Sequence, residues 1–141
     1  MSTAAMEDPD AAPSSWVDAD WTPVCALDDI VPNTGVCALI GGRQIAVVRV
    51  GEGDRVFAID NFDPFSKAFV LSRGIVGDKN GVPKIASPIF KQSFSLLTGE
   101  CFEKPGVAVP TYEARVRRGE IEVRVPTAPE RRRAGPPARP R

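Results

Sequence analysis

The sequence predicts an all-β protein, and two patterns carry this prediction. From Trp21 to Val125, short runs rich in Val and Ile alternate with turn-forming residues. Over the same stretch, apolar residues do not recur at helical spacing for more than two turns. The chain has 141 residues, enough for one domain with its own core and too few for a second of ordinary size. We therefore expect a single β domain.

The first expected strands form a meander of three. Val36–Ile40 and Gln44–Val50 are rich in Val and Ile, and Gly41-Gly42 between them tolerates the positive φ angles of a tight hairpin turn. A second turn at residues 51–54 leads into Arg55–Ile59, which completes the meander.

The stretch from Asp60 to Gln92 interrupts the strand pattern. It contains many turn-formers and little strand pattern, and it is longer than the roughly 12–15 residues of an ordinary unstructured connection. It is also too apolar to be disordered, because it contains Phe62, Phe65, Phe69, Ile75, Ile89 and Phe90. We expect it to form an ordered lobe packed on the sheet.

Two hairpins are expected after the lobe. The first consists of Ser93–Leu97 and Cys101–Glu103. The second pairs Tyr112–Arg117 with Glu120–Val125 through a turn at Arg118-Gly119, and apolar and charged residues alternate along both arms. This period-two pattern is typical of strands with one buried face.

The two ends of the chain differ from the middle in composition. Residues 1–20 carry five acidic side chains and no Lys or Arg, whereas residues 126–141 carry five Arg and one Glu. Both ends are rich in Pro and Ala and cannot bury enough apolar surface to offset chain entropy. The sequence therefore predicts a disordered acidic segment at 1–20, a folded domain at 21–125, and a disordered Pro/Arg-rich tail at 126–141.

The charge balance argues against nucleic acid and membrane partners. The chain carries 18 basic and 18 acidic side chains, and its folded segment is nearly neutral with a single Tyr. The N-terminal segment lacks the basic and apolar regions of a signal peptide, and no apolar stretch approaches the ~20 residues of a membrane span. We expect a cytoplasmic protein.

The Cys and His content of the chain excludes most kinds of catalytic and metal-binding site. The chain has no His, which excludes imidazole acid-base catalysis and imidazole metal ligands. Its three cysteines, Cys25, Cys37 and Cys101, are widely spaced and form no Cys-x-x-Cys pair, so free thiols are expected. No catalytic residue is predicted.

Two excursions beyond the meander, at Asn61–Phe65 and Ser87–Phe90, precede Phe94–Gly99 and the closing hairpin. This arrangement resembles a Rieske domain. The resemblance implies an antiparallel sandwich or small barrel, with the inserted lobe where the [2Fe-2S] cluster would sit. In that family the excursions carry Cys-x-His and Cys-Pro-x-His, whose cysteines bind one iron and whose histidines bind the other.

The four ligand positions are all substituted in this chain. The resemblance places the first pair at Asp63 and Phe65 and the second pair at Ser87 and Phe90. Phenylalanine has no lone pair to offer a metal, so no metal or cofactor site is predicted in this chain. We expect Phe65 and Phe90 to act as apolar plugs that fill the space a cluster would occupy.

Within the Rieske domains, the chain is similar to the small subunits of assimilatory NAD(P)H-dependent nitrite reductase. The most specific segments are residues 63–68, 71–78 and 87–94. The resemblance implies a non-catalytic subunit that binds a large subunit carrying FAD, an iron-sulfur cluster and sirohaem, which reduces nitrite to ammonium. Arg73 and Lys91 are candidate contacts to that partner. A stand-alone Rieske-like binding module and a ferredoxin-type electron carrier are the alternatives.

Overall fold

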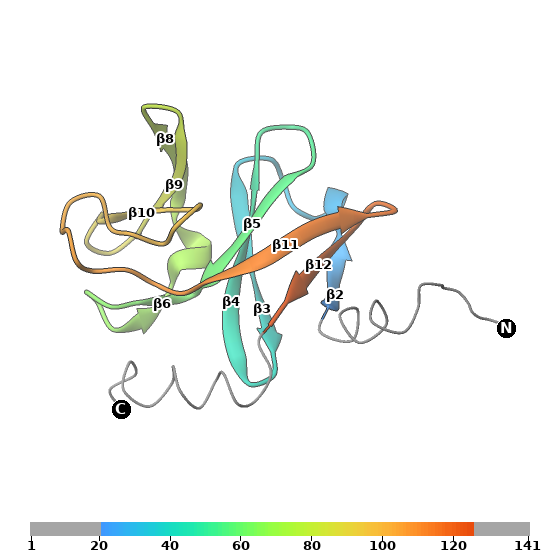
Figure 1. Ribbon diagram of the computed structural model, residues 1–141, viewed down its shortest axis with the longest axis horizontal. Coiled ribbons are helices and arrows are strands. Elements are labelled where there is room, and N and C mark those ends of the chain that lie inside the picture. Colours follow the sequence, from blue (N-terminus) through green and yellow to red (C-terminus); the bar gives the residue numbers. More distant parts are fainter. Residues whose placement is uncertain (1–20, 126–141) are drawn as a thin grey trace, which may run out of the picture. The chain divides into compact units, whose positions relative to one another are not determined.

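The computed structural model describes residues 21–125 and shows an all-β protein built on a six-stranded sheet (Figure 1). The strand order in this sheet is β2-β12-β11-β5-β4-β3. Its strands are β2 (Trp21–Ala26), β3 (Thr34–Ile40), β4 (Arg43–Val50), β5 (Arg55–Asp60), β11 (Thr111–Arg117) and β12 (Glu120–Arg124). The predicted all-β class is thereby confirmed. The disordered segments predicted at 1–20 and 126–141 lie outside the described residues.

The chain divides into two compact units, one of which, Pro23–Val123, contains nearly all the described residues. In this unit the predicted meander is confirmed, because β3, β4 and β5 pair antiparallel in sequence order. Gly41 and Gly42 take the positive φ angles that their hairpin requires. The final hairpin is also confirmed, with β11 and β12 as neighbours in the sheet.

The lobe is ordered, as expected, and it contains more strand than expected. A three-stranded antiparallel sheet and a two-stranded one lie beside the main sheet (Figure 1). The lobe contains β6 (Phe62–Asp63), β7 (Ala68–Phe69), β8 (Ile75–Lys79), β9 (Val82–Ala86) and the 3-10 turn η2 (Leu71–Arg73). The next strand, β10 (Ser93–Ser95), completes its three-stranded sheet, and another 3-10 turn, η1 (Leu27–Asp29), precedes β3. The expectation of little strand pattern between Asp60 and Gln92 was wrong. Asn80-Gly81, both at positive φ, joins β8 to β9 in a hairpin.

The predicted hairpin of Ser93–Leu97 with Cys101–Glu103 is reduced to a single bridge between Phe94 and Cys101. The reason is local, because the chain turns sharply after Ser95. The Ser95 hydroxyl accepts hydrogen bonds from the backbone N–H groups of residues 97 and 98, at 3.1 Å each. β10 therefore ends at Ser95 and pairs with β9.

Strand β4 is buried on both faces, with every residue from Ile45 to Arg49 buried. Because side chains alternate along a strand, Ala46 and Val48 face one way and Ile45 and Val47 the other. Ala46 and Val48 belong to a cluster with residues from η2, β9 and β10, so the lobe covers this face. Because both faces are buried, the sequence of such a strand is a continuous apolar run, without alternation of apolar and polar residues.

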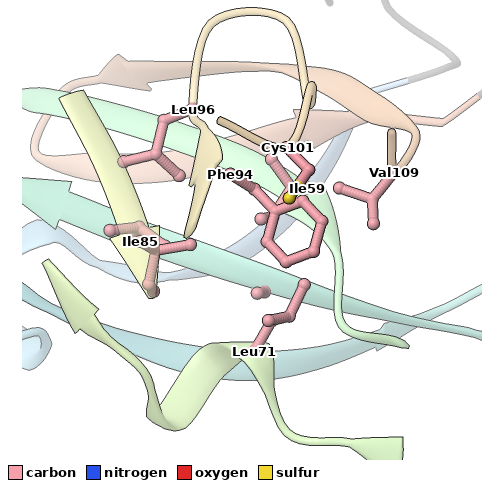
Figure 2. Packing of buried hydrophobic residues seen from close by; sticks show 9 residues of the cluster. Ile59, Leu71, Ile85, Phe94, Leu96, Cys101 and Val109 are labelled. Atoms are coloured by element: carbon pink, nitrogen blue, oxygen red, sulfur yellow. The ribbon is translucent and has the colours of Figure 1, made fainter. Parts of the chain in front are cut away.

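The core between sheet and lobe is centred on Phe94, which is fully buried (Figure 2). Its ring points toward Leu71 of η2, with Ile85 of β9 on one side and Val109 on the other. Burying a Phe side chain contributes about 1.5–3 kcal/mol, so this residue is a principal link between the two parts. The lobe is thus part of the domain core.

The one buried arginine of the described chain, Arg49, joins three backbone segments. Its guanidinium group donates to the carbonyl oxygens of Ile30 at 2.9 Å, Glu52 at 2.8 Å and Gly53 at 3.1 Å. These bonds attach the segment after η1 and the β4–β5 turn to the C-terminal end of β4. The exposed carboxylate of Asp28 lies 3.5 Å from the same group.

Within the described residues, no helix is long and apolar enough to cross a membrane.

Candidate functional site

Two five-residue turns of the lobe occupy the positions of the two predicted ligand pairs. In the first turn, Asp63–Lys67, the backbone N–H of Lys67 donates to the carbonyl oxygen of Asp63 at 2.7 Å. The backbone N–H of Phe65 donates to Oδ1 of Asp63 at 2.9 Å. An acidic side chain that accepts from the backbone two residues later stabilises such a turn, and Pro64 restricts its second position.

The second turn, Ser87–Lys91, repeats this local design. The N–H of Lys91 donates to the carbonyl oxygen of Ser87 at 3.1 Å, and the N–H of Ile89 donates to the Ser87 hydroxyl at 3.2 Å. Pro88 again follows the first residue. Lys91 has φ 69° and Lys67 of the first turn has φ 60°, so each turn ends in a left-handed lysine. We call the two segments the paired turns.

The left-handed conformation is costly for lysine. Because Cβ approaches the following carbonyl oxygen, an L-residue in this region costs about 1–2 kcal/mol, whereas glycine adopts it freely. Both turns therefore retain a cation at a position where glycine would be more stable. Such strain is typical of functional segments.

A buried hydrogen bond joins the paired turns at their first residues. The Ser87 hydroxyl donates to Oδ2 of Asp63 at 2.6 Å, and the Ser66 hydroxyl donates to the same oxygen at 2.8 Å. Asp63 and Ser87 are both fully buried. The Asp63 carboxyl group thus accepts bonds from two hydroxyls and one backbone N–H, which satisfies its burial. Where the resemblance places two cysteines, this chain has a hydrogen-bonded Asp–Ser pair.

The two phenylalanines at the remaining positions have different environments. Phe65 is half-buried, packs against the core cluster, and has its ring centroid 6.1 Å from that of Phe94. Phe90, in contrast, is 57% exposed, so the expectation that it plugs an internal space was wrong. Between the turns, the Ser66 and Ser87 hydroxyls donate to Asp63, and a ring buried among these polar groups could not replace their hydrogen bonds.

These residues do not fit a [2Fe-2S] cluster. Such a cluster needs four thiolate or imidazole ligands, and the two phenylalanine side chains supply none. In the part of the chain that the structure describes, no group of three or more His, Cys, Asp or Glu side chains could hold a metal ion. The three cysteines are free, and burial raises the pKa of each thiol, so they favour the protonated form.

A second polar network, which the sequence analysis missed, supports the first turn. Asn61 is buried, and its side-chain oxygen accepts the backbone N–H of Ser72 at 2.6 Å. Its amide nitrogen donates to Oε1 of Gln44 at 3.2 Å. Asn61 therefore connects the start of β4 to η2, just before the first turn begins. The available signal was an amide residue placed directly after the buried strand β5.

Both candidate partner contacts lie at or beside the second turn. Lys91 ends that turn, and its ammonium group lies 3.4 Å from the carbonyl oxygen of Pro88. Arg73 is exposed at the end of η2, and Gly74 after it lies against Ala86, the residue that precedes the turn. A Cβ at Gly74 would overlap with the Ala86 carbonyl oxygen, so only glycine permits this close approach.

Comparison with known proteins agrees with this fold. Residues 20–124 match the family described as the Rieske-like [2Fe-2S] domain, and the chain belongs to that family. The nitrite reductase (NADH) small subunit of Salmonella typhimurium is 47% identical over 106 residues, which cover 75% of this chain and 98% of that protein. Within the Rieske-like family, the chain therefore belongs to the nitrite reductase small subunits, which confirms the predicted resemblance.

Two further relatives extend this result. The solution structure of the Escherichia coli protein NirD superimposes with a TM-score of 0.71 and 46% identity, covering 76% of this chain and 97% of that one. A segment of the NAD(P)H nitrite reductase large subunit of Klebsiella oxytoca is 41% identical over 103 residues. This match covers 73% of the present chain and 11% of the Klebsiella protein.

Proposed function

We propose that this chain is the accessory small subunit of an NAD(P)H-dependent nitrite reductase and acts by binding the large subunit. The Klebsiella oxytoca large subunit carries the main support, because it contains a segment 41% identical to this chain within its own polypeptide. Covalent linkage gives such a segment a high effective concentration at its partner, and a separate chain must replace that linkage by binding. The FAD, iron-sulfur cluster and sirohaem of the reaction then belong to the large subunit.

The chemistry of the paired turns supports a non-catalytic role. Asp63 and Ser87 are fully buried and bonded to each other, so neither can reach a substrate. The raised pKa values of the three thiols make them weak nucleophiles near neutral pH. Their free state supports a reducing compartment, and we place the protein in the cytoplasm.

A ferredoxin-type role is disfavoured by the same site. Electron transfer through this fold would need a cluster, and Phe65 and Phe90 provide no ligand atoms. A purified chain that shows visible absorption bands with stoichiometric iron would support that role. We expect a colourless protein.

Co-expression with the large subunit from the same organism tests the proposal. The two chains should elute together in size-exclusion chromatography, and nitrite-dependent oxidation of NADH or NADPH should be faster with the small chain than without it. The small chain alone should show no such oxidation. Separate elution, together with equal rates in the presence and absence of this chain, would contradict the proposal.

A further inference from the structure

Exposed apolar side chains are concentrated around the paired turns. Four of the seven large hydrophobic residues that are exposed in the described chain lie in the lobe. Ile89 and Phe90 belong to the second turn, and Ile75 pairs with Ala86, next to that turn. Phe69 pairs with Phe62 across β6 and β7, beside the first turn. We use the name turn face for these exposed residues together with the two left-handed lysines: Lys67, Phe69, Ile75, Ile89, Phe90 and Lys91.

The lobe is also the cationic part of a nearly neutral domain. Residues 61–92 contain five Lys and Arg against two Asp, and one of these, Asp63, is buried. The rest of the described chain contains eight Lys and Arg against ten Asp and Glu. A partner surface complementary to the lobe would therefore be acidic at its rim, and such complementarity speeds association and selects the partner.

The interior of the paired turns makes this face rigid without a metal. Short hydrogen bonds link Asp63 to Ser66 and Ser87. The Asn61 network holds the chain just before the first turn. Phe90 and the lysines thus project from turns that are already ordered in the free protein. A preorganised face loses little conformational freedom when it binds.

We propose that the turn face docks on the large subunit of nitrite reductase, against an apolar surface rimmed by acidic side chains. This inference rests on the proposed function and adds the surface by which it works. Phe90 serves as the apolar anchor, and Lys67 and Lys91 as flanking cations. The strain in the two lysines is retained because glycine, although more stable there, would remove the cations.

The lysine substitutions separate stability from binding. In Lys67→Gly/Lys91→Gly, relief of two left-handed residues should raise the unfolding temperature by several degrees. The same variant should bind the large subunit at least tenfold more weakly, as measured by titration calorimetry. Arg118→Gly is the matched control, because Arg118 is an exposed, left-handed cation in the β11–β12 turn, with φ 54°. It should gain stability without losing affinity.

A second pair of variants tests the apolar part of the face. Phe90→Ala should weaken binding by about tenfold or more, as truncation of an interface anchor does. Val31→Ala is its control, because Val31 is 66% exposed between η1 and β3, outside the lobe. Both variants should unfold at the wild-type temperature, since both side chains are largely exposed. The wild-type affinity should fall as salt concentration rises.

The outcomes distinguish this inference from the proposed function. If the wild-type chain does not bind the large subunit, the proposed function fails. If the wild-type chain binds and both the double lysine variant and Phe90→Ala bind equally well, the turn face is overturned while the proposed function stands. Equal losses of affinity in Arg118→Gly and the lysine variant would also overturn it, because they would show a general effect of charge.

Discussion

Asp63 and Ser87 are 24 residues apart in the sequence and share a 2.6 Å hydrogen bond in the interior. In a cluster-binding Rieske domain, ligand bonds to iron would hold these two loops together. Here the carboxyl group of Asp63 does so by accepting from both turns. The same carboxyl group also accepts from the Ser66 hydroxyl and the backbone N–H of Phe65, so three donors from the two turns satisfy it.

Removal of the inter-turn donor should weaken the fold measurably. In Ser87→Ala, Asp63 loses its bond to the second turn and the N–H of Ile89 loses its acceptor. We expect a loss of about 1–3 kcal/mol in the free energy of unfolding, the usual cost of unsatisfied buried polar groups. Urea denaturation measures it.

Ser66→Ala is the matched comparison for this prediction. Ser66 donates to the same Asp63 oxygen, but it lies within the first turn and is half-buried, so water can replace its hydroxyl. Its cost should be below about 1 kcal/mol. Equal losses in the two variants would show that the link between the turns has no special role.

The elements of the lobe are positioned by close backbone contacts. Gly74 follows η2 and lies against β9, where the Ala86 carbonyl oxygen occupies the space of a Cβ. Gly35 of β3 similarly lies against η2, since a Cβ there would approach the Ser72 carbonyl oxygen to 2.9 Å. The 3-10 turn is thus packed between a strand of the main sheet and a strand of the lobe.

Substitution at Gly74 should disturb this packing. In Gly74→Ala, the added methyl group overlaps with the Ala86 carbonyl oxygen and approaches Cγ1 of Ile85 to 2.9 Å. We expect a loss of about 1–3 kcal/mol, as for other overpacked sites, measured by thermal and urea unfolding. Gly53→Ala serves as the control, because no heavy atom lies within 4 Å of the added Cβ. A Gly74→Ala variant as stable as Gly53→Ala would contradict the packing described here.

Lobe and main sheet share one core, so the described domain should unfold in one cooperative transition. Glu103, in the segment after β10, makes the stability of this domain depend on pH. Burial acts to raise the pKa of Glu103, but hydrogen bonds from the backbone N–H and hydroxyl of Ser93, at 2.8 and 2.7 Å, outweigh it and lower the pKa. The ionised side chain is therefore stabilised in the folded protein.

The sign of this effect predicts a loss of stability in acid. The contribution of Glu103 is complete above the pKa of a free glutamate, about 4.3. It is lost as the pH falls through the lower pKa of the folded state. In Glu103→Gln, the stability measured by denaturation between about pH 2 and 6 should depend less on pH than in the wild type. Ser93→Ala should act in the same direction, and curves parallel to the wild type in both variants would refute the prediction.

Much of the fold could be predicted from local patterns. Val- and Ile-rich runs separated by Gly41-Gly42 predicted two strands of the meander, and alternating residues predicted β11 and β12. The β8–β9 hairpin was also readable, because Asn80-Gly81 is a strong turn signal, but its surroundings resembled a loop. Gly77 and Pro83 weaken the strand pattern on either side of this turn, so the hairpin was not predicted.

The β class, the family, and the lack of cluster ligands at Phe65 and Phe90 could all be predicted without a structure. These follow from residue types and their spacing along the chain. The hydrogen bond between Asp63 and Ser87, the support of η2 by Asn61 and the exposure of Phe90 are visible only in the folded protein. The physical reason is that periodicity indicates which face of a strand is apolar, whereas partners and exposure depend on segments brought together from distant parts of the chain.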